Sequence, residues 1–584
     1  MTGNAGRGET VSFTFEGRSI ECRAGVSVAA ALAGAGEFRL RATNAGDGRG
    51  LFCGMGVCQE CRVNVDGQHG VRACVTRVTP GSQVRRDGLP KVDGNHPASV
   101  VQAGDERPAT KIAEPDLLVI GGGAGGLTGA SIAAEAGADV VLLDERKARG
   151  GQYFKQPANQ QLLHDSLADD LQITRGRRLV ERATHSGAKI ISNAQVWGAF
   201  APAEFAVLEE AGSTIYRPRH TIVATGAYER GLPLPGWTLP GVMTTGAAQG
   251  MLRNYGNVPA GRIVVAGNGP LNLQIALELK RAGADVRLVA ELADASLLRW
   301  MTNGLRMVSS VPKFAFDGIG YLRGLRKADV PVRFGQCLAE VTETEGGLAA
   351  RIGAVRGSTV EHHKIVAADV VCVGYGFQPS NEILRCLGCS HSYDKSRGHL
   401  VTERSEDCET TVPGVYAVGD CAGFSGAPAA LQDGAIAAHA VLRSLDCEVS
   451  DNHAAELRDA QRARPRHRAF QAALWRLFDA PRFSTQLAAE STLICRCENV
   501  SLGDVAAAVQ DGATSLAAIK QRTRLGMGPC QGRYCAPVAA ELLAERSGQP
   551  VDEYSFFAPR PPLKPVRIAD IVGGDVSQPS DSSR

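Results

Sequence analysis

The feature that most constrains the fold of this chain is a glycine-rich turn placed directly between an apolar strand and a helix. In its first copy, the strand 117–120 runs into Gly121-Gly-Gly-Ala-Gly-Gly126, an alanine-rich helix follows, and a second strand leads to Asp144. This order is the full dinucleotide-binding fingerprint, in which a pyrophosphate rests on the helix N-terminus. We expect Gly121 to form the turn, Gly123 to clear the path of the phosphates and Asp144 to bind a ribose.

A second copy of the turn lies near the middle of the chain. The strand 262–266 leads into Gly267-Asn-Gly269-Pro-Leu-Asn272, and Glu291 follows the next strand. Asn272 stands where a third glycine normally lets helix and strand pack closely. Gly267, Gly269 and Glu291 are the expected contacts of a second nucleotide, either NAD or another adenine nucleotide. A vestigial turn, or one that holds a nucleotide only structurally, stays open as an alternative.

Two further motifs resemble those of the glutathione-reductase-like flavoproteins. One is Thr225-Gly226 at the end of an apolar strand, and the other is Gly419-Asp420 at the end of the run 414–418. In that family the aspartate binds the ribitol chain of FAD, so three separated motifs agree on this cofactor. The FAD contacts that we expect are Gly121, Gly123, Ala124, Gly126, Asp144, Glu145, Gln152, Val196, Thr225, Gly226, Gly419 and Asp420.

Four cysteines in the first hundred residues have the spacing C-x4-C-x2-C-x12-C, which is the plant-type ferredoxin arrangement for a 2Fe-2S cluster. Gly54 and Gly56 permit the unusual backbone angles that a loop around a cluster needs. Charges of both signs surround the set, so we expect the cluster to serve its own polypeptide or a fixed partner. A zinc site or unligated cysteines remain the alternative. The expected ligands are Cys53, Cys58, Cys61 and Cys74.

Four cysteines near the other end are spaced C-x-C-x32-C-x4-C. The segment resembles the bacterioferritin-associated-ferredoxin-like (BFD-like) domain, a small helical 2Fe-2S module, although its last pair is spaced by four residues where simpler members have two. Zinc therefore stays open as an alternative here. The expected ligands are Cys495, Cys497, Cys530 and Cys535.

Composition excludes several classes of protein. The 63 lysines and arginines balance 61 aspartates and glutamates, which argues against a nucleic-acid binder or a polybasic membrane-surface protein. We find no signal peptide and no transmembrane segment in the sequence, so we expect a cytoplasmic protein. In a reducing compartment, regularly spaced members of the sixteen cysteines favour metal ligation over disulfides.

These patterns predict an α/β chain with two dinucleotide-binding domains of glutathione-reductase type, flanked by an N-terminal β-grasp ferredoxin domain and a C-terminal small helical BFD-like domain. The expected boundaries are 8–100 for the ferredoxin-like domain, 113–250 and 367–450 for the two parts of the FAD domain, 251–366 for the inserted NAD-like domain, 488–548 for the BFD-like domain and 549–584 for a tail.

Taken in order, the motifs resemble the alpha subunits of multi-subunit amine oxidoreductases. The resemblance covers about residues 8–548 and rests on both cysteine sets, Gly150-Gly-Gln152, Pro235-Gly-Trp, Val373-Gly-Tyr-Gly-Phe and Arg524-Leu-Gly-Met-Gly-Pro. That family includes opine oxidase, hydrogen cyanide synthase, hydroxyproline and proline dehydrogenases and heterotetrameric sarcosine oxidase. The long folate-binding half of sarcosine oxidase alpha chains has no counterpart here.

The resemblance implies an electron-transferring subunit in a hetero-oligomer. Its partner would be an FAD subunit resembling glycine or D-amino-acid oxidases, and that partner would oxidise the secondary amine or amino acid. The sequence does not identify a catalytic residue in this chain. An NADH-dependent FAD and iron-sulfur reductase is the second hypothesis, and Asn272 argues against it. A scaffold with vestigial centres is the third, and eight intact cysteine ligands argue against it.

Overall fold

The N-terminal unit of the computed structural model, which describes residues 9–88 and 111–572, is a mixed sheet that packs against one helix. The strand order is β2-β1-β7-β5-β6, and β1 pairs with β7 in parallel. Alternate residues of β1 are buried and give the sheet its apolar face. The elements are β1 (Thr10–Phe15), β2 (Arg18–Arg23), α1 (Val28–Gly34), β5 (Arg62–Val65), β6 (Gln68–Arg72) and β7 (Gln83–Arg86). This arrangement confirms the β-grasp expectation.

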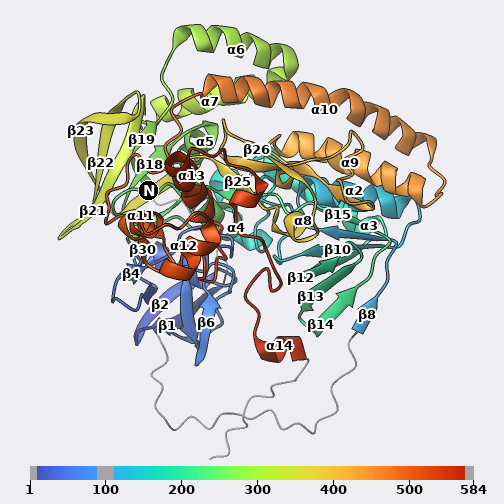
Figure 1. Ribbon diagram of the computed structural model, residues 1–584, viewed down its shortest axis with the longest axis horizontal. Helices are drawn as coiled ribbons and strands as arrows, with labels where there is room; N and C mark the ends of the chain where they lie inside the picture. The colour runs from blue at the N-terminus through green and yellow to red at the C-terminus, as the bar shows by residue number, and fades with distance from the viewer. Residues whose placement is uncertain (1–8, 89–110, 573–584) are drawn as a thin grey trace, which may run out of the picture.

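The second unit contains a five-stranded parallel sheet in the order β11-β10-β9-β15-β28. Its central strand is buried along its whole length, as a parallel strand covered on both faces should be. Figure 1 shows α2 and α9 side by side against this sheet, and a Cβ on Gly434 would lie 2.2 Å from the carbonyl oxygen of Gly125. The elements are β9 (Leu117–Ile120), α2 (Ala124–Glu135), β10 (Val140–Asp144), α3 (Leu171–His185), β11 (Lys189–Ser192), β15 (His220–Val223), β28 (Val415–Ala417) and α9 (Ala427–Ser444).

The third unit repeats the parallel design in the order β17-β24-β18-β19-β20. Two of its five strands lie outside the expected 251–366 range, one before it and one after it. The elements are β17 (Val242–Thr244), α4 (Thr245–Tyr255), β18 (Arg262–Gly267), α5 (Pro270–Arg281), β19 (Asp285–Glu291), α6 (Leu297–Ser310), α7 (Pro312–Lys327), β20 (Val332–Phe334) and β24 (Val370–Gly374). An antiparallel sheet adjoins it, formed by β21 (Gln336–Thr344), β22 (Gly347–Arg356) and β23 (Thr359–Ala368).

The two nucleotide-type units also contain a mixed sheet and a pair of short antiparallel strands. The sheet has the order β12-β13-β14-β8, from β8 (Lys111–Ala113), β12 (Gln195–Ala201), β13 (Glu204–Glu209) and β14 (Gly212–Tyr216). The pair is β16 (Ala227–Glu229) with β25 (Phe377–Pro379).

The C-terminal unit is helical, as the sequence predicts. The long helix α10 (Asp451–Leu477) leads to it and packs along α6 and α9 (Figure 1). Its elements are β29 (Leu493–Cys495), β30 (Val500–Ser501), α11 (Leu502–Gln510), α12 (Leu516–Thr523) and α13 (Ala536–Ser547), and α14 (Ile568–Val572) follows in the tail. None of the helices in the described ranges combines the length and apolar character that a membrane crossing requires.

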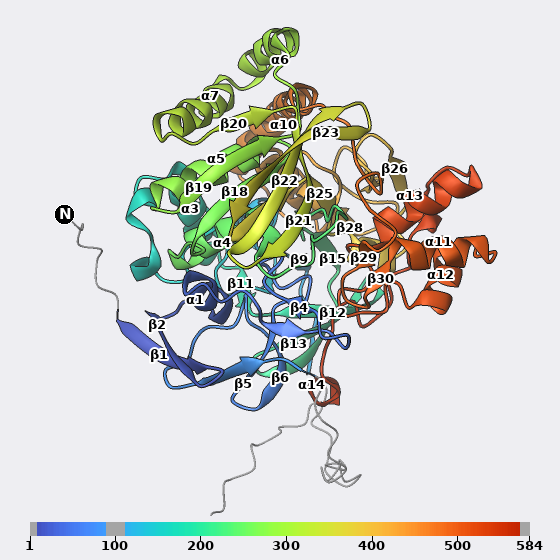
Figure 2. The same ribbon diagram turned by 90° about the vertical axis from the view of Figure 1, so that its left-hand side faces the viewer.

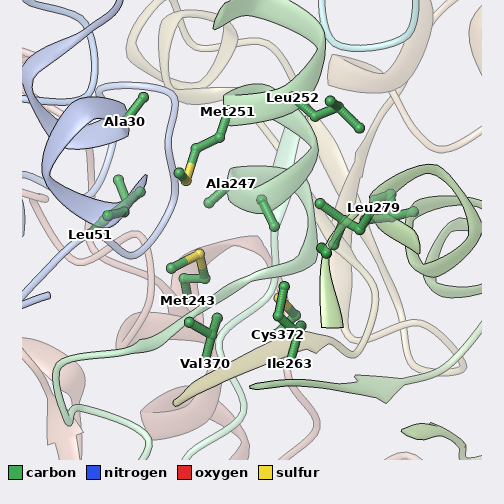
Figure 3. Close-up of a cluster of buried hydrophobic side chains, with 14 of the residues drawn as sticks. Ala30, Leu51, Met243, Ala247, Met251, Leu252, Ile263, Leu279, Val370 and Cys372 are labelled. Carbon is green, nitrogen blue, oxygen red and sulfur yellow. The ribbon is translucent and has the colours of Figure 1, made fainter. Parts of the chain in front are cut away.

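The N-terminal unit shares its core with the third unit. Figure 3 shows Ala30 and Leu51 of the N-terminal unit facing Ala247 and Met251 of α4, in one continuous buried cluster. Burying apolar surface between units is strongly favourable, so the ferredoxin-like unit is held in a fixed position rather than tethered.

The N-terminal and C-terminal units also meet. Figures 1 and 2 both show the C-terminal unit beside the N-terminal unit, next to the hairpin of β3 (Arg41–Ala42) and β4 (Gly48–Arg49). Across this contact, Arg49 Nη2 donates a hydrogen bond to Asn499 Oδ1 at 2.8 Å. The two cysteine sets are therefore brought together in space.

Candidate redox site

A cavity of about 560 Å³ lies at the carboxyl ends of β9, β10 and β15, where a doubly wound sheet places its ligand. Every expected FAD contact except Gly126 lines it, and Gly269 of the second turn lines it as well. Gly267 and Glu291 do not line it. The cavity thus begins at the first glycine turn and extends towards the second.

The three glycines of the first turn have different surroundings. Gly121 has a φ of +112°, and an added Cβ would lie 2.4 Å from the carbonyl oxygen of Ala224. A Cβ on Gly126 would lie 1.9 Å from the carbonyl oxygen of Gly121. At Gly123 the nearest atom to an added Cβ is 3.7 Å away, on Gly151. Positions 121 and 126 therefore need glycine because a side chain there would collide with the backbone. At position 123 a side chain would collide with nothing, and the space beside it is open towards the cavity.

Two carboxylates hold the backbone in place at the two ends of the expected FAD site. Asp144 accepts hydrogen bonds from the amides of Gly122 and Arg146, both at 2.8 Å, and so holds the glycine turn against β10. Asp420 accepts the amides of Ser425 at 3.1 Å and Gly426 at 2.9 Å, just before α9. Gly123 caps α2 without a side-chain hydrogen bond, so the first amides of that helix are free to bind an anion. These features fit the pyrophosphate and ribitol of FAD.

Glu145 is placed differently from the other expected contacts. It lines the cavity, but its carboxylate pairs with Arg72 of β6 at 2.9 Å and with Lys564 of the tail. Burial raises the pKa of Glu145, but the charges of Lys564 and Arg72 outweigh it and lower the pKa to about 2. Glu145 therefore joins three parts of the chain as a permanent anion.

The second turn keeps its shape without a third glycine. The Asn272 side chain is buried, donates to the carbonyl oxygen of Gly374 at 3.0 Å and accepts from the Thr245 hydroxyl at 2.9 Å. Glu291 accepts the amide of Gly269 at 3.0 Å, and burial raises its pKa to about 7. Side-chain hydrogen bonds thus replace close packing at this turn.

The first cysteine set is fully buried, and its loop has the expected conformation. Gly54 and Gly56 have φ values of +65° and +80°. The Cys53 sulfur accepts the amides of Met55 at 3.5 Å and Cys58 at 3.4 Å. Burial raises the pKa of the Cys53 thiol, but the hydrogen bonds from Cys58 and from the loop amides outweigh it and lower the pKa to about 6. An amide-lined loop that favours thiolates fits a bound cluster.

The second cysteine set also converges, although its members lie on separate segments. The Cys495 thiol contacts those of Cys497 and Cys535, and these hydrogen bonds lower its pKa to about 3 against the effect of burial. Cys497 also contacts Cys530. In the described parts of the chain, no three Cys, His, Asp or Glu side chains surround one point closely enough for a single metal ion.

Several residues of the site were not expected from the sequence. Cys53, Met55 and Val57 line the flavin-type cavity, so the first cysteine set touches it directly. Lys155 and Glu229 are buried and line it as well. Burial lowers the pKa of Lys155 to about 7 and raises that of Glu229 to about 7. The run Gly150-Gly-Gln-Tyr-Phe-Lys was visible in the sequence, but nothing in it indicated that its lysine is buried.

Comparison with known proteins agrees with this arrangement. A family model described as pyridine nucleotide-disulphide oxidoreductase matches residues 115–434, which is more than half of the chain. Models described as a 2Fe-2S iron-sulfur cluster binding domain and a BFD-like [2Fe-2S] binding domain match residues 8–88 and 493–545. The chain belongs to the pyridine nucleotide-disulphide oxidoreductase family, carries an iron-sulfur domain at each end, and is an oxidoreductase component.

Individual relatives narrow the comparison. The chain is 32% identical over 469 residues to an opine oxidase subunit of Rhizobium meliloti, covering 78% of this chain and 98% of that one. It is 30% identical to hydrogen cyanide synthase subunit HcnB of Pseudomonas aeruginosa, covering 77% and 96%. The crystal structure of L-proline dehydrogenase from P. horikoshii shares the fold, with a TM-score of 0.70, 20% identity and coverage of 97% and 98%.

Proposed function

We propose that this chain is the electron-transferring FAD and iron-sulfur subunit of a multi-subunit dehydrogenase or oxidase for a secondary amine or amino acid of the opine, proline, glycine or sarcosine class. One observation carries the proposal: the loop of the first cysteine set and the expected FAD contacts line the same cavity. A flavin accepts an electron pair and releases single electrons, which iron-sulfur clusters accept one at a time.

The residues of the chain have defined tasks in this proposal. The free amides at the start of α2 bind the pyrophosphate, and Asp420 before α9 orients the ribitol. Met55 and Val57, which line the cavity beside Cys53, would exclude water from its wall when the flavin is bound. Lys155, which also lines the cavity and has a pKa of about 7, would hold or release a proton there at physiological pH.

Relatives support the substrate class and the hetero-oligomer. The opine oxidase and hydrogen cyanide synthase relatives are both named as one subunit of a larger enzyme. We expect the partner to be an FAD subunit resembling glycine or D-amino-acid oxidases and to meet the amine. All sixteen cysteines lie in the described residues and none forms a disulfide, which suits a cytoplasmic enzyme.

An exposed apolar stripe on α6 supports a partner protein. Leu297, Met301 and Leu305 follow one another at helical spacing and are 65–74% exposed. Trp300 and Met307, on the same helix, line the flavin cavity. Clustered exposed apolar side chains mark interfaces, and a partner packed here would lie next to the cavity.

The NADH-dependent reductase is the second candidate, and one observation favours it: the cavity reaches Gly269 of the second turn. Against it, Gly267 and Glu291 of the second turn do not line the cavity, whereas their counterparts Gly121 and Asp144 do. A second adenine nucleotide bound for structural reasons is compatible with both candidates.

Native purification tests the proposal. The chain should co-purify with a flavoprotein, and a panel of amino acids and secondary amines, added without oxygen, should bleach the absorbance of the complex with one member of the panel. A chain that purifies alone with full activity towards an amine would contradict it.

A further inference from the structure

The two cysteine sets share one small cavity. Cys58 of the first set lines it together with all four cysteines of the second set, although they come from opposite ends of the chain. Only three other residues line this cavity, Glu60, Arg496 and Tyr534, and all three are buried. Each of the three is adjacent in sequence to a ligand cysteine. The two cysteine sets therefore adjoin one cavity, and the side chains of Glu60, Arg496 and Tyr534 with their buried neighbours form the layer between them.

The layer contains a buried charge cluster. Glu60 is 1% exposed and pairs with Arg41 at 3.1 Å, with Arg496 at 3.8 Å and with Arg49 at 3.9 Å. Arg49 also pairs with the half-exposed Asp47 at 3.8 Å, so three guanidinium groups face two carboxylates and leave an excess of one positive charge. Buried ion clusters are costly and rarely justified by stability alone. A cluster held by four thiolates carries net negative charge, which this excess would offset.

Polar atoms in the layer lack partners. Within the described residues, Glu60 Oε2, Arg49 Nε, Arg496 Nε and the Tyr534 hydroxyl are buried and make no hydrogen bond. Buried polar groups are nearly always satisfied, so these four atoms, three of them on side chains that line the cavity, need an explanation. Two of them, on Arg496 and Tyr534, are donors on side chains that line the cavity. Cluster sulfurs are acceptors of the kind such donors require.

Aromatic rings hold the layer rigid. The Arg496 guanidinium lies 3.9 Å from the centroid of the Phe52 ring and 4.7 Å from that of Trp237. The Tyr534 ring meets the Phe52 ring edge-on at 5.4 Å. Phe52 precedes the ligand Cys53, so it joins the first ligand loop directly to the residues beside the second.

We propose that the two cysteine sets bind their clusters as one coupled pair, and that Glu60, Arg496 and Tyr534 are positioning residues that fix the spacing and the relative potentials of the two centres. This inference rests on the proposed cluster binding. Arg496 and Tyr534 donate to cluster sulfurs, and Glu60 compensates part of the arginine charge. Each centre holds one electron, so the pair together holds the two electrons of one reduced flavin.

Electron paramagnetic resonance of the fully reduced holoprotein tests the coupling. We expect a spectrum that is split or broadened and that differs from the sum of the spectra of Cys58→Ala and Cys497→Ala, each with one remaining cluster. Wild-type protein reduced by one electron per pair of clusters gives a reference spectrum without any substitution. Only one of the two clusters is then paramagnetic, so its signal cannot be split by the other. A full spectrum equal to the sum of isolated signals, at full iron content, would overturn the coupling. Absence of iron from either set would instead overturn the proposed cluster binding.

Redox titration tests the positioning residues. Glu60→Gln removes a negative charge and should raise the midpoint potentials of both clusters, whereas Arg496→Gln should lower them. Glu60→Asp and Arg496→Lys keep the charge and should restore values near those of wild type. The matched control is Glu135→Gln, which removes an ion pair between Glu135 on α2 and Arg182 on α3 (2.7 Å). This variant should change neither potential. Unchanged potentials in Glu60→Gln and Arg496→Gln with both clusters bound would overturn the assignment.

Discussion

Replacing Gly123 by alanine should separate cofactor binding from folding. An added Cβ meets no atom closer than 3.7 Å, and the φ of −87° suits any residue. Alanine is a poorer helix N-cap than glycine by a few tenths to about 1 kcal/mol, but it reduces the entropy of the unfolded chain by a similar amount. The net change in stability of the flavin-free protein should therefore stay within about 1 kcal/mol.

The effect of Gly123→Ala on the flavin should be larger. The new methyl group points into the space where the pyrophosphate approaches the start of α2, and an anion held by backbone amides cannot move away without losing them. We expect at least a tenfold loss of FAD affinity, which corresponds to about 1.4 kcal/mol.

Gly126→Ala is the matched comparison. Its Cβ would lie 1.9 Å from the carbonyl oxygen of Gly121, so α2 must move away from the turn, at a cost of about 1–3 kcal/mol or more. The assay compares thermal unfolding midpoints of the flavin-free proteins and the FAD released per chain. Full FAD affinity in Gly123→Ala, or an unchanged midpoint in Gly126→Ala, would refute this reading of the turn.

Three further predictions follow from the same structure. Wild type should contain about four irons and four acid-labile sulfides per chain, and Cys58→Ala and Cys497→Ala should each lose about half of both; zinc in place of iron at either set would contradict this. Burial lowers the pKa of His399 to about 4, so the unfolded state binds the extra proton between pH 6.5 and 4 and stability falls as the pH drops through that window, by about 3 kcal/mol. His399→Phe should flatten that part of the unfolding curve, and an unchanged pH dependence would show that another group is responsible. Leu305→Glu on the α6 stripe should reduce co-purification of the partner, whereas Leu171→Glu, at a leucine that is also exposed (56%) but lies on α3, should not; equal retention in both would place the partner elsewhere.

The glycine turn and the first cysteine loop were predictable from the sequence because each depends on residues that lie close together along the chain. The turn 121–126 and the loop 53–58 each place their glycines and ligands within a few residues, and the structure shows the backbone angles that these patterns require. The β-grasp, doubly wound and helical units were also predictable, since each has its own periodicity and turn signals.

The relations between units were not predictable. Arg49 meets Asn499, and Glu145 meets Lys564, across more than 400 residues, and no spacing rule connects such positions. The charges of both signs around the first cysteine set did not indicate which of them are buried. In the structure Glu60 is buried among arginines, and Arg72 pairs with Glu145. At the second turn the missing glycine indicated a loss of close packing, whereas the Asn272 amide supplies hydrogen bonds that no glycine offers.

Anaerobic reduction of the isolated chain, followed by flavin and cluster absorbance, tests the central claim most directly. Under the proposed function, the chain should not bleach rapidly with the amine that reduces the native complex, because the partner rather than this chain would meet the amine. It should bleach with that amine once the partner flavoprotein is added. Rapid bleaching by the amine without a partner would contradict the account, and rapid bleaching by NADH alone would replace it with the reductase.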